Sequence, residues 1–194
     1  MTTQSTVTRA ASHSAQTGAA RTNSATAISL AVLRVSMGFV FLWAFLDKAF
    51  GLHYSTPSSK AWIHGGSPTK GFLTSVDVGP LQSWFHSIAG TWWADWLFML
   101  GLLGVGLTLI LGVLIYAGTA AGVLLLGLMW LAEFPLAQHT SAGVASGSTN
   151  PFADYHYIYA LVLVVLALTG AAQTWGLGPM WAAQPVIRRH PWLR

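Results

Sequence analysis

Long apolar runs separated by polar segments dominate the pattern along this chain. The first run covers residues 27–48 and ends on the charged pair Asp47 and Lys48. From Trp96 to Ala132 no charged residue occurs, over a stretch longer than the ~20 residues that one membrane helix uses. This stretch is therefore expected to turn back on itself and form two antiparallel helices.

The apolar pattern predicts four helices, at about 27–48, 94–115, 119–136 and 155–174. The turn between the second and third is expected at Tyr116–Gly118. Pro151 suits the approach to the fourth helix, because proline is favoured at helix starts. The predicted fold class is all-α: an integral membrane four-helix bundle of residues 27–176 with a long extracytoplasmic loop between the first and second helices.

Two polar tails flank this membrane domain, residues 1–26 and residues 177–194. The first is rich in Ser, Thr and Ala and lacks acids, which predicts a disordered basic tail; an organellar transit peptide is the second interpretation. Because basic tails stay in the cytoplasm, an even number of spans predicts a multi-pass plasma-membrane protein with both termini cytoplasmic. Three lysines of the first loop oppose this orientation: Lys48, Lys60 and Lys70.

Composition supports a lipid-facing surface and limits the chemistry. Hydrophobic residues make up 54% of the chain and charged residues 7%, with a mean hydropathy of +0.56. Since soluble domains carry about a quarter charged residues, the lipid bilayer is the expected partner. The basic residues lie mainly in the tails and are not interleaved with aromatic residues, so nucleic acid is not an expected partner.

No haem, iron–sulfur or thiol motif is present, since the chain has no cysteine and no predicted helix carries two histidines at ligand spacing. No metal site is predicted. A zinc site in the first loop stays an open alternative, with ligands drawn from His53, His64 and His86.

Small residues recur at four-residue spacing in the middle hairpin. Gly104, Thr108 and Gly112 form one such row, and Gly118 with Gly122 forms another. Faces of this kind let helix backbones approach closely. Packing within the chain is the favoured interpretation, ahead of a dimer interface.

The predicted topology brings ionisable side chains together at the extracytoplasmic mouth of the bundle. Asp47, Glu133, Asp154 and His156 are the candidate catalytic residues there, since adjacent carboxylates and a histidine can exchange protons. Replacing Asp47 or Asp154 by Asn is expected to impair function more than folding. The alternative is structural: Asp154 caps a helix, Asp47 pairs with Lys48 at the interface, and His156 is an interfacial histidine.

Quinone is the expected ligand of this mouth. Quinone reduction or quinol oxidation needs hydrogen-bonding groups, a proton route to water and apolar walls. Arg34, Trp43 and Lys48 on the first helix are the expected quinone- or substrate-binding residues. For Arg34 the alternative is structural, either reaching lipid phosphate or bonding Tyr116 or Gln173.

Three segments carry a family resemblance: LRVSMGFVFLWAFLDKAFG in the first helix, WIHGGSPTKGF in the loop and NPFADYHYIYALVL at the fourth helix. Over Leu33–Gly170 the chain resembles the DoxX family, and within it the DoxD-type large membrane subunits of thiosulfate:quinone oxidoreductases. The resemblance implies four helices, oxidation of thiosulfate to tetrathionate with electrons passed to membrane quinone, and a second subunit. A second implication is a non-catalytic membrane scaffold for redox or oxidative-stress proteins.

Overall fold

The described part of the chain is all helical, as the apolar pattern predicts. The computed structural model describes residues 3–190 and 193, with side chains from residue 24 onward. Within these residues it contains eight α-helices, three short 3-10 helices and no β-strand, apart from one isolated bridge between His139 and Ala145.

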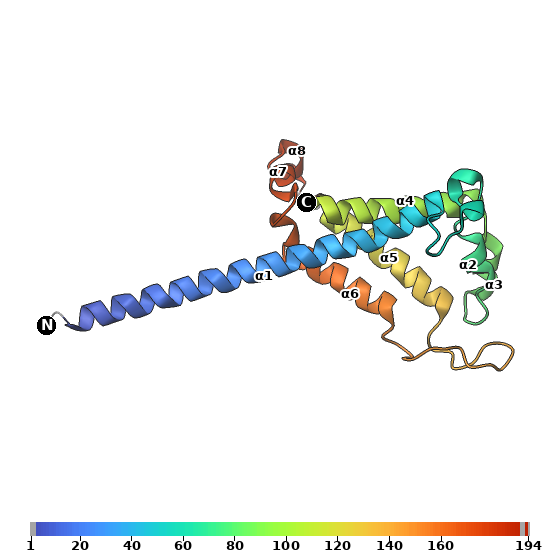
Figure 1. Ribbon diagram of the computed structural model, residues 1–194, viewed down its shortest axis with the longest axis horizontal. Coiled ribbons are helices and arrows are strands. Elements are labelled where there is room, and N and C mark those ends of the chain that lie inside the picture. The colour runs from blue at the N-terminus through green and yellow to red at the C-terminus, as the bar shows by residue number, and fades with distance from the viewer. Residues whose placement is uncertain (1–2, 191–192, 194) are drawn as a thin grey trace.

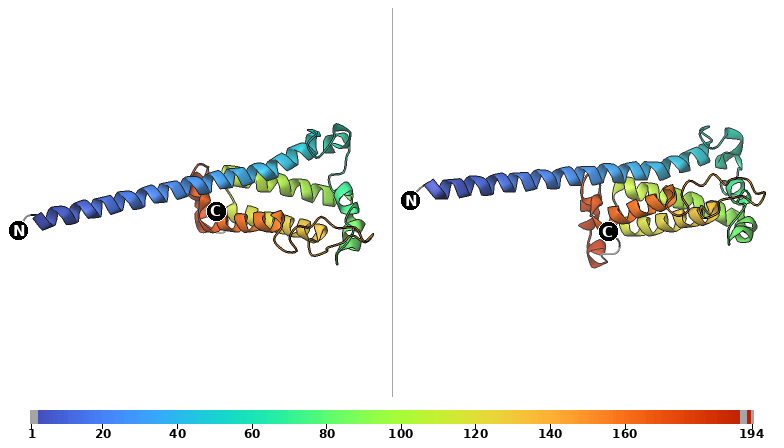
Figure 2. Two further views of the ribbon diagram at one scale, coloured as in Figure 1. Left: turned by 60° about the horizontal axis from the view of Figure 1, so that its bottom comes forward. Right: turned by 90° about the horizontal axis from the view of Figure 1, so that it is seen from below.

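Four helices run alternately in opposite directions and pack side by side: α1 (Thr3–Phe50), α4 (Trp92–Leu111), α5 (Ile115–Glu133) and α6 (Tyr155–Leu168) (Figure 1, Figure 2). Successive helices of this set are neighbours, and α1 also contacts α6. We call the end near Phe50, Trp92, Glu133 and Tyr155 the loop end. The opposite end, near Leu111 and Ile115, is the hairpin end.

Three of these helices contain segments long and apolar enough to cross a membrane: Ser24–Phe50, Trp92–Leu111 and Ile115–Glu133. Helix α6 is apolar but has 14 residues. At ~1.5 Å per residue it spans roughly 21 Å, short of the ~30 Å hydrocarbon core. The fourth helix was predicted at 155–174, but α6 ends at Leu168, and a left-handed Gly170 separates it from the 3-10 helix η3 (Ala171–Gln173).

The turn in the middle hairpin lies earlier than Tyr116–Gly118, so that prediction is wrong. Helix α4 ends at Leu111, and Gly112 caps it with φ 73°, in the left-handed region that glycine adopts without a Cβ clash. Leu114 is also left-handed, and α5 starts at Ile115. Gly118 therefore lies inside a helix, where its missing side chain serves packing.

Both tails contain helices. Helix α1 continues back to Thr3 and projects beyond the bundle, where composition predicts a disordered tail (Figure 1). This segment is rich in alanine and has no proline, and extending an existing helix avoids the cost of nucleation. At the other terminus, α7 (Gly178–Ala182) and α8 (Pro185–Arg189) occupy most of the predicted basic tail.

The connection between α1 and α4 is folded against the loop end. It contains η1 (Ser58–Lys60), η2 (Trp62–His64), α2 (Lys70–Thr74) and α3 (Gln82–Ile88). A small apolar core joins it to α5: Leu73, Val76, Phe85 and Ala132. The main core lies between the long helices and includes the fully buried Met99, Leu109, Leu163 and Leu166.

Small residues bring the helices of this chain close together. A Cβ built on Gly118 would lie 2.3 Å from Cγ2 of Thr108, and one on Gly122 would lie 2.5 Å from Cδ1 of Leu163. The prediction of packing within the chain is therefore confirmed at Gly118 and Gly122. Around Gly104 nothing lies within 4 Å of such a Cβ.

Candidate functional site

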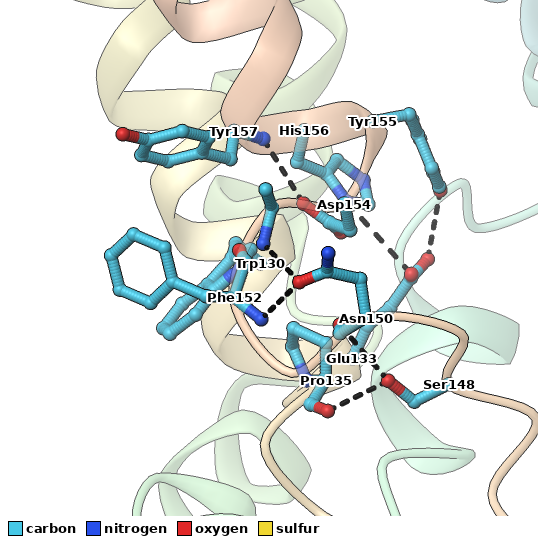
Figure 3. A network of polar contacts seen from close by, with 11 residues as sticks. Trp130, Glu133, Pro135, Ser148, Asn150, Phe152, Asp154, Tyr155, His156 and Tyr157 are labelled. Atoms are coloured by element: carbon cyan, nitrogen blue, oxygen red, sulfur yellow. Dashed lines mark hydrogen bonds and ion pairs between the residues drawn. The ribbon is translucent and has the colours of Figure 1, made fainter.

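Four side chains from two helices meet at the loop end, and we call them the acid–histidine cluster: Glu133, Asp154, Tyr155 and His156 (Figure 3). Nδ1 of His156 lies 2.8 Å from Oδ2 of Asp154 and 3.8 Å from Oε2 of Glu133. The hydroxyl of Tyr155 donates to Oε1 of Glu133 at 3.0 Å. Three of the four predicted catalytic residues are therefore together.

The start of α6 explains this arrangement. Asp154 is the N-cap, with extended backbone, and its Oδ1 accepts from the amide of Tyr157 at 3.0 Å. The segment before the helix is held by Asn150, whose Oδ1 accepts hydrogen bonds from the amides of Phe152 and Ala153. Once the helix begins here, His156 lies on the same buried face as Leu163, seven residues later.

His156 is buried, with a hydrogen-bond partner at one ring nitrogen and none at the other among the described residues. Its side chain is 1% exposed, and the carboxylate at Nδ1 favours the tautomer with the proton on that nitrogen. Nε2 is buried and has no hydrogen-bond partner among the described residues. In that tautomer Nε2 carries a lone pair and can accept a hydrogen bond from a ligand, while protonation of the ring makes it a donor.

An open cavity of about 400 Å³ adjoins the cluster, within the range of small-molecule sites. The α2–α3 region, the end of α5 and the segment 140–150 form its walls. Three acids line it, Asp77, Glu133 and Asp154, and the described lining contains no Lys, Arg or His. This charge pattern favours neutral or cationic ligands and disfavours dianions.

Asp77, which lines the cavity, also joins two loops through Ser141. Ser141 donates from its amide to Oδ2 of Asp77 at 2.7 Å and from its hydroxyl to Oδ1. These hydrogen bonds hold the pKa of the Asp77 carboxyl below its usual value, because they stabilise the charged form.

Asp47, the fourth predicted catalytic residue, binds the loop that follows α1. Its carboxylate accepts from the amide of Tyr54 at 3.1 Å, and from the amide and hydroxyl of Ser55 at 3.0 and 2.6 Å. Lys48 follows the same pattern, with Nζ 3.5 Å from Oγ of Ser55. The structure thus uses this pair to fasten the chain after α1 rather than to complete the cluster.

Trp43 also lies apart from the cluster's contacts. Its ring packs against Phe39, at 5.6 Å between centroids, and against Tyr54, at 5.1 Å. These contacts keep the tryptophan on the α1 side of the loop end, where it supports the same loop that Asp47 fastens.

Arg34 lies at the hairpin end, about 20 Å along α1 from Asp47 at the usual helical rise. Its guanidinium is fully buried and donates to the carbonyls of four residues: Leu109, Ile110, Thr174 and Trp175. Neither Tyr116 nor Gln173 is among these partners. The arginine therefore joins α1, the end of α4 and the segment after η3, away from the expected ligand site.

Asp95 is a buried acid that the sequence patterns did not single out. It is 7% exposed, in the first turn of α4. Its Oδ1 accepts from the hydroxyl of Ser67 at 2.9 Å and from the amide and hydroxyl of Thr69 at 3.0 and 2.6 Å. The sequence signal that could have identified Asp95 is its position as a single acid at the start of a strongly apolar helix.

The histidines of the first loop have separate partners. Nε2 of His53 lies 2.8 Å from the hydroxyl of Ser58, and Nδ1 of His64 lies 2.9 Å from the carbonyl of the same residue. Nε2 of His86 contacts the carbonyl of Val76 at 2.8 Å. Among the described residues, the one His/Asp/Glu group with metal-ligand spacing is Glu133, Asp154 and His156.

Comparisons with protein-family models, curated proteins and solved structures find no match to this chain. The functional argument therefore rests on the residues and on the geometry of the acid–histidine cluster.

Proposed function

We propose that this chain is the membrane subunit of a quinone-linked oxidoreductase of the DoxX type. In this proposal α1, α4, α5 and the α6–η3 segment cross the plasma membrane as a four-helix bundle, with both termini in the cytoplasm. The apolar lengths of three helices and the basic residues of the two tails support it. The loop end then faces the extracytoplasmic side.

The observation that carries the proposal is the pairing of Asp154 with a buried His156 at the end of an apolar bundle. Quinone reduction adds two electrons and two protons to a lipid-soluble ring. It therefore requires a proton-handling group that an apolar molecule can reach from the membrane. A histidine that contacts two carboxylates, beside a cavity that those carboxylates line, supplies the proton-handling group.

The electron donor in this proposal is thiosulfate, two of which lose one electron each and join as tetrathionate. Thiosulfate is a dianion, and the cavity beside the cluster is lined by three acids. We therefore assign thiosulfate oxidation to a second subunit and quinone reduction to this chain. The absence of cysteine in the sequence agrees with that division, because this chain has no thiol to carry sulfur.

The test is purification of the full chain in mild detergent together with copurifying chains, followed by an anaerobic assay of thiosulfate-dependent decyl-ubiquinone reduction. We expect reduction by the complex and none by the isolated chain. Glu133→Gln should slow the reaction, and Arg188→Gln, at an exposed position of α8, should not. A tight partner without quinone reduction would contradict the proposal and favour a scaffold.

A further inference from the structure

We infer that Nε2 of His156 is the atom that hydrogen-bonds a quinone oxygen and delivers one of its two protons. This inference rests on the proposed function and makes it specific to one atom. Figure 3 shows His156 at the start of α6, beside Asp154 and Tyr155, with Glu133 reaching the group from the end of α5.

The first step is the unpaired nitrogen. Buried polar atoms are nearly always hydrogen-bonded, and leaving one unpaired costs about 1–3 kcal/mol. Nε2 of His156 is buried without a partner, although Nδ1 of the same ring is fixed 2.8 Å from Asp154. The ring cannot turn to pair Nε2 without giving up the contact at Nδ1. With a ligand bound at Nε2, both ring nitrogens would have hydrogen-bond partners.

The second step is the character of the surroundings. His156 shares its helix face with Leu163 and Leu166, which belong to the main apolar core. A quinone head group has an apolar ring with two carbonyl oxygens that accept hydrogen bonds, so it pairs with Nε2 when the imidazole is protonated and Nε2–H is a donor.

The third step is the path of the proton. In the imidazolium form both ring nitrogens carry protons, and Nδ1–H lies 2.8 Å from Oδ2 of Asp154 and 3.8 Å from Oε2 of Glu133. After the quinone has received electrons that originate from thiosulfate, Nε2–H passes its proton to the reduced quinone oxygen. The ring becomes neutral and keeps its proton at Nδ1. Water in the cavity beside Glu133 and Asp154 is the source from which the imidazole is recharged.

Two replacements separate the roles of the two ring nitrogens. The amide of Asn lies near the position of Nδ1, whereas the amide of Gln reaches toward the position of Nε2. The experiment measures binding of decyl-ubiquinone to the full chain in mild detergent by quenching of tryptophan fluorescence. The copurified complex is assayed for turnover. His139→Asn, at an exposed position, is the matched control.

We expect His156→Asn to weaken quinone binding about tenfold, the size expected for one buried hydrogen bond. His156→Gln should bind within a few-fold of wild type, because its amide can donate to the quinone oxygen. Its turnover should fall about 10²–10⁴-fold, because an amide does not release a proton. The control should match wild type in both measurements.

Wild-type affinity and turnover in His156→Asn would overturn the inference and leave the proposed function standing. Absence of quinone binding to wild type would overturn both. If neither variant folds, wild type labelled with ¹⁵N-histidine supplies the test. The Nε2 resonance of His156 should shift when decyl-ubiquinone is added, and an unchanged resonance at saturating quinone would reject the contact.

Discussion

Nη1 of Arg34, in α1, donates a hydrogen bond to the carbonyl oxygen of Ile110, 3.1 Å away in the last turn of α4. The last carbonyls of a helix lack partners within it, and a cation there also opposes the helix dipole. The same guanidinium reaches the chain after η3 through Thr174 and Trp175. One side chain therefore fixes the hairpin end and the start of the C-terminal segment.

Arg34→Gln is expected to lower thermal stability strongly. A glutamine can donate to fewer carbonyls than the four that Arg34 reaches. Each buried carbonyl left without a donor costs about 1–3 kcal/mol. Thermal unfolding of the purified protein in detergent measures the change, with Arg188→Gln as an exposed arginine control. Equal melting temperatures for the two variants would show that the buried contacts add nothing.

Gly118→Ala is expected to destabilise the bundle by about 1–3 kcal/mol, as overpacking does. The new methyl would lie 2.3 Å from Cγ2 of Thr108 and 2.9 Å from its Cβ, so α4 and α5 must separate. Gly104→Ala is the matched control, because nothing lies within 4 Å of its added Cβ. Alanine favours helix over glycine by about 1 kcal/mol, so the control should be neutral or slightly stabilising. The reverse order of melting temperatures would contradict this packing.

The apolar pattern predicts the order of α1, α4, α5 and α6 and the approximate limits of the three segments long enough to cross a membrane, whereas α6 ends at Leu168, short of the predicted limit. The turn of the middle hairpin was missed by four residues, because Gly112 and Gly118 both suit a turn and only packing against Thr108 decides between them. The pattern also predicts which helix ends meet, and this places Glu133, Asp154 and His156 correctly together.

Hydrogen bonding within loops is what the sequence patterns did not predict. Asp47 stands at the expected helix end, yet the amides of Tyr54 and Ser55 fold back to its carboxylate. Asp95 likewise draws a distant segment to itself through Thr69. Such choices depend on the path of the connecting chain, which apolar periodicity does not describe.

Asp47→Asn is now expected to impair folding of the first loop, contrary to the expectation from sequence alone. In wild type each carboxylate oxygen of Asp47 accepts from a backbone amide, that of Tyr54 or that of Ser55. Asparagine has only one accepting oxygen, so its NH₂ group would face one of these two donors. We expect faster proteolysis within residues 51–69, compared with wild type and with the exposed control Lys60→Gln. Wild-type protection in Asp47→Asn would mean that the loop does not depend on this carboxylate.

The contact between Asp77 and Ser141 is expected to weaken in acid. Its hydrogen bonds hold the pKa of Asp77 below the usual value, so the folded loop binds the proton more weakly than the unfolded chain. The resulting stabilisation is fully present above about pH 3.9 and is lost as pH falls through the lower, folded pKa. The ¹³C carboxyl resonance of Asp77 should titrate below the usual pKa of an aspartate, and Ser141→Ala should raise its midpoint. A midpoint unchanged by Ser141→Ala would show that the hydroxyl does not stabilise the carboxylate.

Photolabelling with an azido-quinone tests most directly whether the acid–histidine cluster is a quinone site. The full chain in mild detergent is irradiated with the probe, with and without excess decyl-ubiquinone, and the labelled peptides are identified by mass spectrometry. We predict labelling of the α6 segment beginning at Tyr155 or of the end of α5 near Glu133, suppressed by the competitor. Competitor-sensitive labelling confined to the hairpin end around Arg34, or no competitor-sensitive labelling at all, would contradict a quinone site at this cluster.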